Sequence, residues 1–247
     1  MIAFFKVILF TPLYNLLIFL TATIPGADLG LAIIILTLLV KLVIFPLYTK
    51  SVRTQIKMKA IEPKLKEIKE KYKDNVQEQS RRTMEIYKQE KINPFSTFFV
   101  LLIQIPIILS LFYVFRSSFT LHADLLYSFV TAPTKINTNF LGLFDLTANK
   151  NIIFSVLTGV TQFLQVRISM PAKPKADVKL GQSFKSDMVR SLDLQMRYFM
   201  PLLTMFIAFT LPSAIALYWV TSNSFSVIYE SLVIKKIKKE SEIIPAN

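Results

Sequence analysis

A single lysine stands inside the otherwise apolar run "LTLLVKLVIFPL" at residues 36–47. A charge held at the middle of a bilayer costs about 2.5–3.5 kcal/mol on insertion scales, and such residues usually face a polar interior. In a wet cavity between helices, Lys41 would attract acidic groups through its charge and its N–H donors, without any covalent step. Snorkelling to the interface is the alternative, but it must overcome about 12 Å of helix rise.

Other polar side chains in apolar surroundings could line the same cavity. Such groups serve either as groove lining or as hydrogen-bonding contacts between helices, which are worth about 0.6 kcal/mol each. The sequence leaves both uses open, and packing or an interfacial position is a further alternative for the two aromatic candidates. The candidates for lining a polar groove, besides Lys41, are Gln104, Gln162, Gln165, Tyr218, Trp219 and Asn223.

Several other kinds of chemistry find no support in the composition. The chain has no Cys and one His, His122, which argues against disulfides, thiolate metal sites and metal clusters. Its five Gly are scattered and form no phosphate-binding loop, so a nucleotide-driven pump is not expected. We therefore expect no cofactor, no metal and no enzymatic activity.

The elements that must position these residues are apolar blocks separated by basic segments. Hydrophobic residues make up 53% of the 247 residues, and the apolar blocks are long enough to cross a hydrocarbon core of about 30 Å. The sequence predicts an all-α integral membrane protein with five transmembrane helices. The expected segments are an interfacial or signal-anchor helix at 1–25, spans at 29–48, 94–115, 151–166, 198–211 and 213–234, a helical hairpin at 49–93, an external loop at 116–150, a cytoplasmic loop at 167–197 and a basic tail at 235–247.

The basic residues also predict the orientation. Segments 49–93, 167–197 and 235–247 hold 24 of the 29 Lys and Arg residues, whereas 117–149 holds only Lys135. We expect the protein to lie in the plasma membrane of a bacterial cell. The positive-inside rule then places the three basic segments, and with them the C-terminus, in the cytoplasm. The basic segments also favour contact with anionic lipids, and attraction to ribosomal RNA is a second use of the same charge.

Four stretches together resemble the YidC-type membrane protein insertases, a family that includes the Oxa insertases of mitochondria and the Albino insertases of chloroplasts. They are "GLAIIILTLLVKLVIFPL", the hairpin with "IEPKLKEIKEKY", "INPFSTFFVLLIQIPIILSLF" and "MRYFMPLLTMFIAFTLPSAIALYWVTSNSFSVI". The resemblance covers residues 12–236. It also favours an interfacial helix on the outer surface for residues 2–20.

The resemblance implies a five-helix core around a water-filled groove that opens to the cytoplasm and sideways to lipid. The family inserts nascent membrane proteins without nucleotide hydrolysis, alone or with the Sec translocon. Substrate segments leave along a flank formed by the third and fifth spans. The hairpin is implicated in receiving substrate and the C-terminal tail in ribosome contact.

This sequence departs from the family pattern in three ways. The groove charge is commonly Arg, and here the matching position is Lys41. The large outer domain of some members is missing, so a minimal core is expected, and the tail is short for ribosome docking. A small solute or ion transporter that uses Lys41 as an intramembrane counter-charge is the main alternative, and a chaperone that only assembles inserted helices is a third. The absence of internal repeats and the long charged hairpin argue against the transporter.

Overall fold

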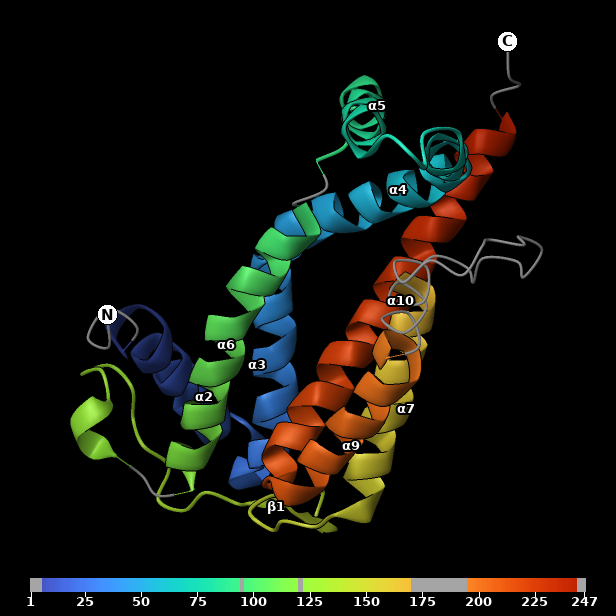
Figure 1. Cartoon of the computed structure of the whole chain (residues 1–247). Coiled ribbons are helices and arrows are strands. Elements are labelled where there is room, and N and C mark those ends of the chain that lie inside the picture. Colours follow the sequence, from blue (N-terminus) through green and yellow to red (C-terminus); the bar gives the residue numbers. More distant parts are fainter. Residues whose placement is uncertain (1–5, 94–95, 120–121, 170–194, 244–247) are drawn as a thin grey trace.

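The computed structural model describes residues 6–93, 96–119, 122–169 and 195–243, and most of this part is helical (Figure 1). The expected helical architecture is confirmed, apart from one small β-hairpin. The longer elements are α2 (Thr11–Thr23), α3 (Leu29–Val43), α4 (Phe45–Lys71), α5 (Val76–Gln89), α6 (Ser96–Ser118), α7 (Ile152–Ser169), α9 (Met200–Thr210) and α10 (Ser213–Ile243). The shorter ones are η1 (Lys6–Phe10), η2 (Pro25–Ala27), η3 (Ala123–Leu125), η4 (Gln195–Phe199), β1 (Asn139–Phe140) and β2 (Phe144–Asp145).

The described helices differ in whether they could cross a membrane alone. By length and composition, Lys6–Thr23 and Ile152–Ser169 are long and apolar enough, and α3 with the first part of α4 would make a third span if the bent pair counts as one. Ile105–Ser117 and Arg197–Thr210 are apolar but shorter. The predicted number of five spans therefore stays a prediction. The predicted loop at 167–197 lies mostly outside the described residues.

The chain divides into two helices where the sequence predicted one span at 29–48. The axes of Leu29–Val43 and Phe45–Met58 meet at 67°. Pro46 lies in the first turn of α4, where its missing N–H is harmless, whereas in a continuous helix its ring would clash with the carbonyl four residues earlier. Lys41 therefore lies about 3 Å of helix rise from the end of α3. The distance of about 12 Å between Lys41 and the interface, which assumed an unbroken span, does not apply.

Helices α4 and α5 form a helical pair beyond this bend. In Figure 1, α4 runs across from the end of α6 toward α10, and α5 lies above it. The turn predicted at 73–75 separates the two helices, and the Asn75 side chain caps α5 by accepting a hydrogen bond from the Glu78 N–H at 3.0 Å. The side of the membrane on which this pair lies stays a prediction.

The opposite end of α3 is fixed by Asp28. One carboxylate oxygen accepts hydrogen bonds from the N–H groups of Gly30 and Leu31, at 2.7 and 3.1 Å, which satisfies free donors of the first helical turn. The other oxygen accepts from the Leu141 N–H at 2.9 Å, in the turn between β1 and β2. Gly30 lies so close to the Phe140 side chain that a Cβ at this position would collide with it. Asp28 therefore joins the start of α3 to the β-hairpin.

The core lies where α10 packs against α3 and α7, and where α2 packs against α3 and α6. On α2, the buried face consists of Tyr14, Asn15, Leu17, Ile18 and Thr21. The Asn15 side chain donates to the Leu125 carbonyl and accepts from the Tyr127 N–H, so it fixes the loop after α6 onto α2. These contacts hold the helices that carry the predicted site residues.

Candidate functional site

Four buried polar residues in the middle part of α10 gather on one face of the helix. Ser222, Ser226 and Glu230 follow each other at intervals of four residues, and residues at this spacing are neighbours on a helix surface. Asn223 lies beside them, and all four are buried. The Ser226 hydroxyl donates to the Ser222 carbonyl at 3.0 Å. This face of α10 meets α3 and α7, so it brings polar groups to the contacts among three helices.

Lys41 reaches this face from the last turn of α3. Its side chain is buried, with 7% of the residue exposed, and Nζ donates to Ser226 Oγ at 3.3 Å. The same Nζ lies 5.4 Å from the centroid of the Tyr48 ring, within the range of a cation–π contact. An ammonium group has three N–H donors, so Lys41 keeps capacity for further acceptors.

Glu230 supplies a second buried charge in the same region. It is 3% exposed, and its two carboxylate oxygens accept hydrogen bonds from different helices. Tyr48 Oη donates to Oε1 at 2.5 Å, and the Ser169 hydroxyl donates to Oε2. In the described part of the chain, Lys41 and Glu230 form no direct ion pair, but Tyr48 contacts both of them.

Sequence reasoning did not single out Glu230. The residue lies within the run 213–234 predicted as a span, and a carboxylate in such a run is the same kind of signal that pointed to Lys41. Glu230 lies near the end of this run, a few residues before the basic tail. The structure buries it beneath the bend between α3 and α4.

Two of the predicted residues meet directly between α7 and α10. The Asn223 side-chain amide donates to Gln162 Oε1 at 3.1 Å and to Thr161 Oγ1 at 3.4 Å. Gln165 follows Gln162 by three residues on α7 and is half-buried. The structure therefore brings Asn223 and Gln162 together. Lys41 of α3 contacts α10 three residues further along, at Ser226.

Two of the remaining predicted residues, Tyr218 and Trp219, lie on α10 four residues before Ser222 and Asn223. Tyr218 is buried in the hydrophobic core, where its ring centroid lies 5.9 Å from that of Phe115 on α6. Trp219 is partly buried and packs against the same core. Gln104 is on α6, but its side chain lies outside the described residues. A groove-lining role for Gln104, Tyr218 and Trp219 thus stays a prediction.

Aromatic residues hold the base of α4 on α10 next to the polar cluster. The ring centroids of Phe45 and Tyr48 lie 4.8 and 5.7 Å from that of Tyr229. The hydroxyls of Thr49 and Tyr229 are 2.6 Å apart. The start of α4 is therefore held on α10 through Tyr229, the residue next to Glu230.

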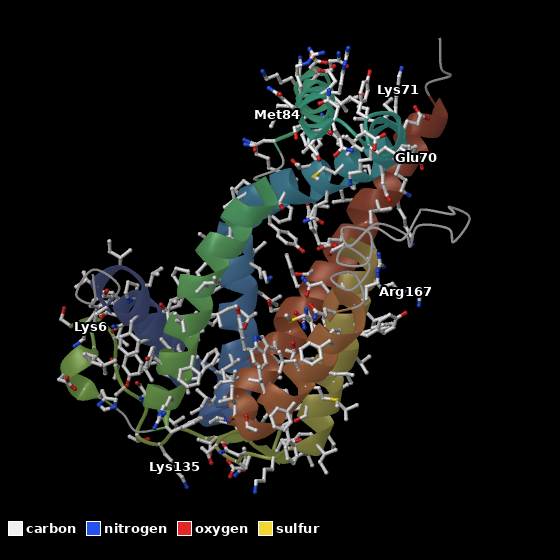
Figure 2. The ribbon with its side chains drawn as sticks, viewed as in Figure 1. Lys6, Glu70, Lys71, Met84, Lys135 and Arg167 are labelled. Atoms are coloured by element: carbon white, nitrogen blue, oxygen red, sulfur yellow. The ribbon has the colours of Figure 1, made fainter. Side chains whose placement is uncertain are left out.

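The charged and apolar surfaces lie in different parts of the molecule. Figure 2 shows Glu70, Lys71 and Met84 at the end with α4 and α5, and Lys135 at the opposite end. Between these ends, apolar side chains on α3, α7 and α10 are exposed, which include Leu42, Val43, Val156, Val160, Ile228 and Leu232. Water-soluble proteins have the opposite arrangement, with charged residues exposed and large apolar patches buried. The arrangement in this chain defines a helical integral membrane protein.

Similarity to known proteins identifies the family within that class. Residues 19–240 match the family described as "60Kd inner membrane protein", and the chain belongs to this family. The resemblance to YidC-type proteins that the sequence motifs indicated is thereby confirmed.

Curated relatives and one solved structure agree with this assignment. Proteins named "Membrane protein insertase YidC" from Francisella philomiragia subsp. philomiragia and Francisella tularensis subsp. novicida are each 33% identical over 205 residues, which cover 83% of this chain and 32% of the relative. The chain therefore spans about a third of the length of these relatives. A crystal structure described as an active YidC insertase with its first transmembrane domain resolved has a TM-score of 0.55 and 25% identity, and the match covers 89% of this chain and 45% of that one.

Proposed function

We propose that this chain inserts nascent membrane proteins into the bilayer and assists their folding, without covalent catalysis or nucleotide hydrolysis. The observation that carries the proposal is the burial of Lys41 against the polar face of α10 in a member of this family. The printed names of the relatives support it, as these name membrane protein insertases.

The proposed role of Lys41 is to attract acidic side chains of the hydrophilic segment that must cross the membrane. Two opposite charges about 4 Å apart interact by about 4 kcal/mol at an effective dielectric constant of about 20. Moving a charged side chain to the bilayer centre costs about 2.5–3.5 kcal/mol. The attraction is thus of the same size as the cost of moving the charged side chain, so one ammonium group could offset most of that cost.

The polar groups on α10 and α7 would lower the remaining cost of dehydration. Asn223, Gln162 and Ser226 offer donors and acceptors that replace water around a passing polar segment. The apolar part of the substrate would leave along the α7 and α10 flank, where Val160, Leu164 and Ile228 are exposed. Its transfer into lipid supplies the driving force, at about 25 cal/mol for each Å² of apolar surface.

The same proposal places the protein in a bacterial plasma membrane, with α4, α5 and the C-terminus in the cytoplasm. The charge distribution supports this orientation through the positive-inside rule. Nascent membrane proteins are then the substrates. The Sec translocon, the ribosome and anionic lipids are proposed partners, the last through the many Lys residues of α4.

The direct test is insertion into proteoliposomes that contain the purified chain. A short test membrane protein with an acidic hydrophilic segment should reach a protease-protected position. Lys41→Ala should lower the yield and Lys41→Arg should preserve it, because Arg keeps the charge. Lys50→Ala removes an exposed lysine of α4 and serves as the matched control. Vesicles that move a small solute but insert no test protein would support the transporter instead.

Photocrosslinking tests the path within the protein. A photoreactive residue at position 41 or 104 should crosslink to a nascent chain stalled during insertion. One at Leu143, which is 76% exposed in the turn of the β-hairpin, should not. Crosslinks from Leu143 but not from 41 or 104 would contradict the proposed groove.

A further inference from the structure

The buried carboxylate of Glu230 has no role in the proposed function described so far. It lies on the same face of α10 as Ser226, one helical turn beyond the hydroxyl that binds Lys41. Tyr48 connects the two charges, as its ring lies under the ammonium and its hydroxyl donates to the carboxylate. The polar cluster therefore holds one positive and one negative group that are close together and not directly paired.

Both charged groups keep unused hydrogen-bonding capacity. An ionised carboxylate offers about four lone-pair sites, and Tyr48 and Ser169 occupy two of those on Glu230. Lys41 donates to Ser226 and has two further N–H donors. If these charges served only to hold the helices together, a direct ion pair would satisfy both at once. Because they are not paired, each keeps hydrogen-bonding positions that a charged side chain of a substrate could fill.

We propose that Glu230 is a specificity residue. It adds a negative charge to the positive charge of Lys41, so the polar cluster can accept basic as well as acidic side chains of the substrate's hydrophilic segment. This inference rests on the proposed function. Lys41 alone would favour acidic segments and repel basic ones. The negative charge of Glu230 offsets the positive potential of Lys41, which would otherwise repel basic side chains. Its carboxylate also supplies an oppositely charged group to which a Lys or Arg of the substrate can bind.

The test compares test proteins that differ only in the charge of the translocated segment. Three versions carry two Asp, two Asn or two Lys at the same positions, and insertion is measured in proteoliposomes. The wild-type chain should insert the Asp and Lys versions with yields within about threefold of each other. Glu230→Gln should raise the ratio of Asp to Lys insertion by about three- to tenfold, because it removes the negative charge.

Glu230→Gln suits this purpose because it preserves the local contacts. The amide oxygen can still accept from Tyr48 Oη, and the amide nitrogen can donate to the Ser169 hydroxyl. Glu70→Gln makes the same chemical change on the exposed surface of α4 and should leave the ratio unchanged. The double variant Lys41→Gln with Glu230→Gln should bring the ratio of Asp to Lys insertion back from the raised value of Glu230→Gln to about one.

The outcomes separate this inference from the proposed function. If the wild type inserts the test proteins and Lys41→Ala impairs this, but Glu230→Gln leaves the Asp to Lys ratio unchanged, the specificity role is wrong and the function stands. An equal loss of all three test proteins in Glu230→Gln would make Glu230 a structural residue only. A wild type that prefers the Asp version strongly over the Lys version would also overturn the inference, without any variant. Failure of the wild type to insert any version would contradict the function itself.

Discussion

Tyr48, in the first turn of α4, donates a hydrogen bond to Glu230 on α10, at 2.5 Å between Oη and Oε1. The two residues are 182 positions apart in the chain. The Tyr48 ring also lies under the Lys41 ammonium, so one side chain contacts both buried charges.

Tyr48→Phe should destabilise the fold by about 1–3 kcal/mol, because it removes the O–H donor of a buried carboxylate and leaves that acceptor with one partner fewer. The aromatic ring under Lys41 is retained, so the effect reports on Glu230. Unfolding in detergent, followed by circular dichroism, measures the change. Tyr113→Phe, on the exposed surface of α6, is the matched control and should have almost no effect. Equal stability of the two variants would argue that the Tyr48 contact contributes nothing.

Ser226→Ala should lower the stability by about 1 kcal/mol, because Lys41 loses an oxygen acceptor in a buried position. We expect the insertion yield for acidic segments to fall less than in Lys41→Ala, since the charge itself remains. The same unfolding and insertion assays apply. Ser224→Ala makes the identical change on a half-buried position of α10. A larger loss in the Ser224 variant than in the Ser226 variant would contradict the assigned hydrogen bond.

Asn223 and Gln162 should show a coupling energy of about 0.6 kcal/mol, the average for a polar contact between membrane helices. A double-mutant cycle with Asn223→Ala and Gln162→Ala isolates this value, because it subtracts the separate effect of each change. The cycle of Asn223→Ala with Gln165→Ala provides the comparison and should give a coupling close to zero. Coupling of the same size in both cycles would show that the Asn223 bond to Gln162 is not specific.

Glu78 should make the order of α5 depend on pH in the acid range. Hydrogen bonds from Arg81 and Arg82 lower the pKa of Glu78 from 4.5 to about 2. A lowered folded-state pKa means that ionised Glu78 stabilises the helix, fully above pH 4.5, and that this contribution is lost as the pH falls from 4.5 to 2. A spin label on a cysteine that replaces Gln77 reports the mobility of α5, and the chain has no other Cys.

The control for the pH experiment is Glu78→Gln, which removes the titrating group. The difference in label mobility between wild type and variant should be constant from pH 7 to 4.5 and should disappear toward pH 2. A difference that stays the same between pH 4.5 and pH 2 would mean that the pKa of Glu78 is not lowered.

The local structure of the chain follows closely from sequence signals that act over a few residues. The turn at 73–75 and the cap at Asn75 were predictable, because a capping side chain needs only the N–H groups of the next helical turn. The break before Pro46 was not predicted, because the apolar run indicates one span at 29–48 that Pro46 closes, although a proline disturbs the helical turn before it. Its position at Ile44 and its angle of 67° were not predictable either, because the packing of α4 on α10 sets them.

The candidate site was predicted in part. Lys41 stood out because a charge in an apolar run is unusual, and Asn223 and Gln162 were both named but could not be paired. Tyr218 was named as a groove candidate, and the structure shows its ring beside Phe115 of α6, a neighbour that the sequence could not identify. A helical pattern shows which residues share a face, but it does not show which neighbouring helix that face will meet.

The sequence by itself determined that this is a helical membrane protein of a known family, with a charge to be accommodated in its first strong apolar run. These properties depend on composition, on the lengths of apolar blocks and on contacts within one or two helical turns. Only the tertiary structure decided that Lys41 binds Ser226, 185 positions away, and that Glu230 lies beside them. Such contacts form because a buried charge must find polar partners wherever the packed helices bring them, and sequence spacing does not record that arrangement.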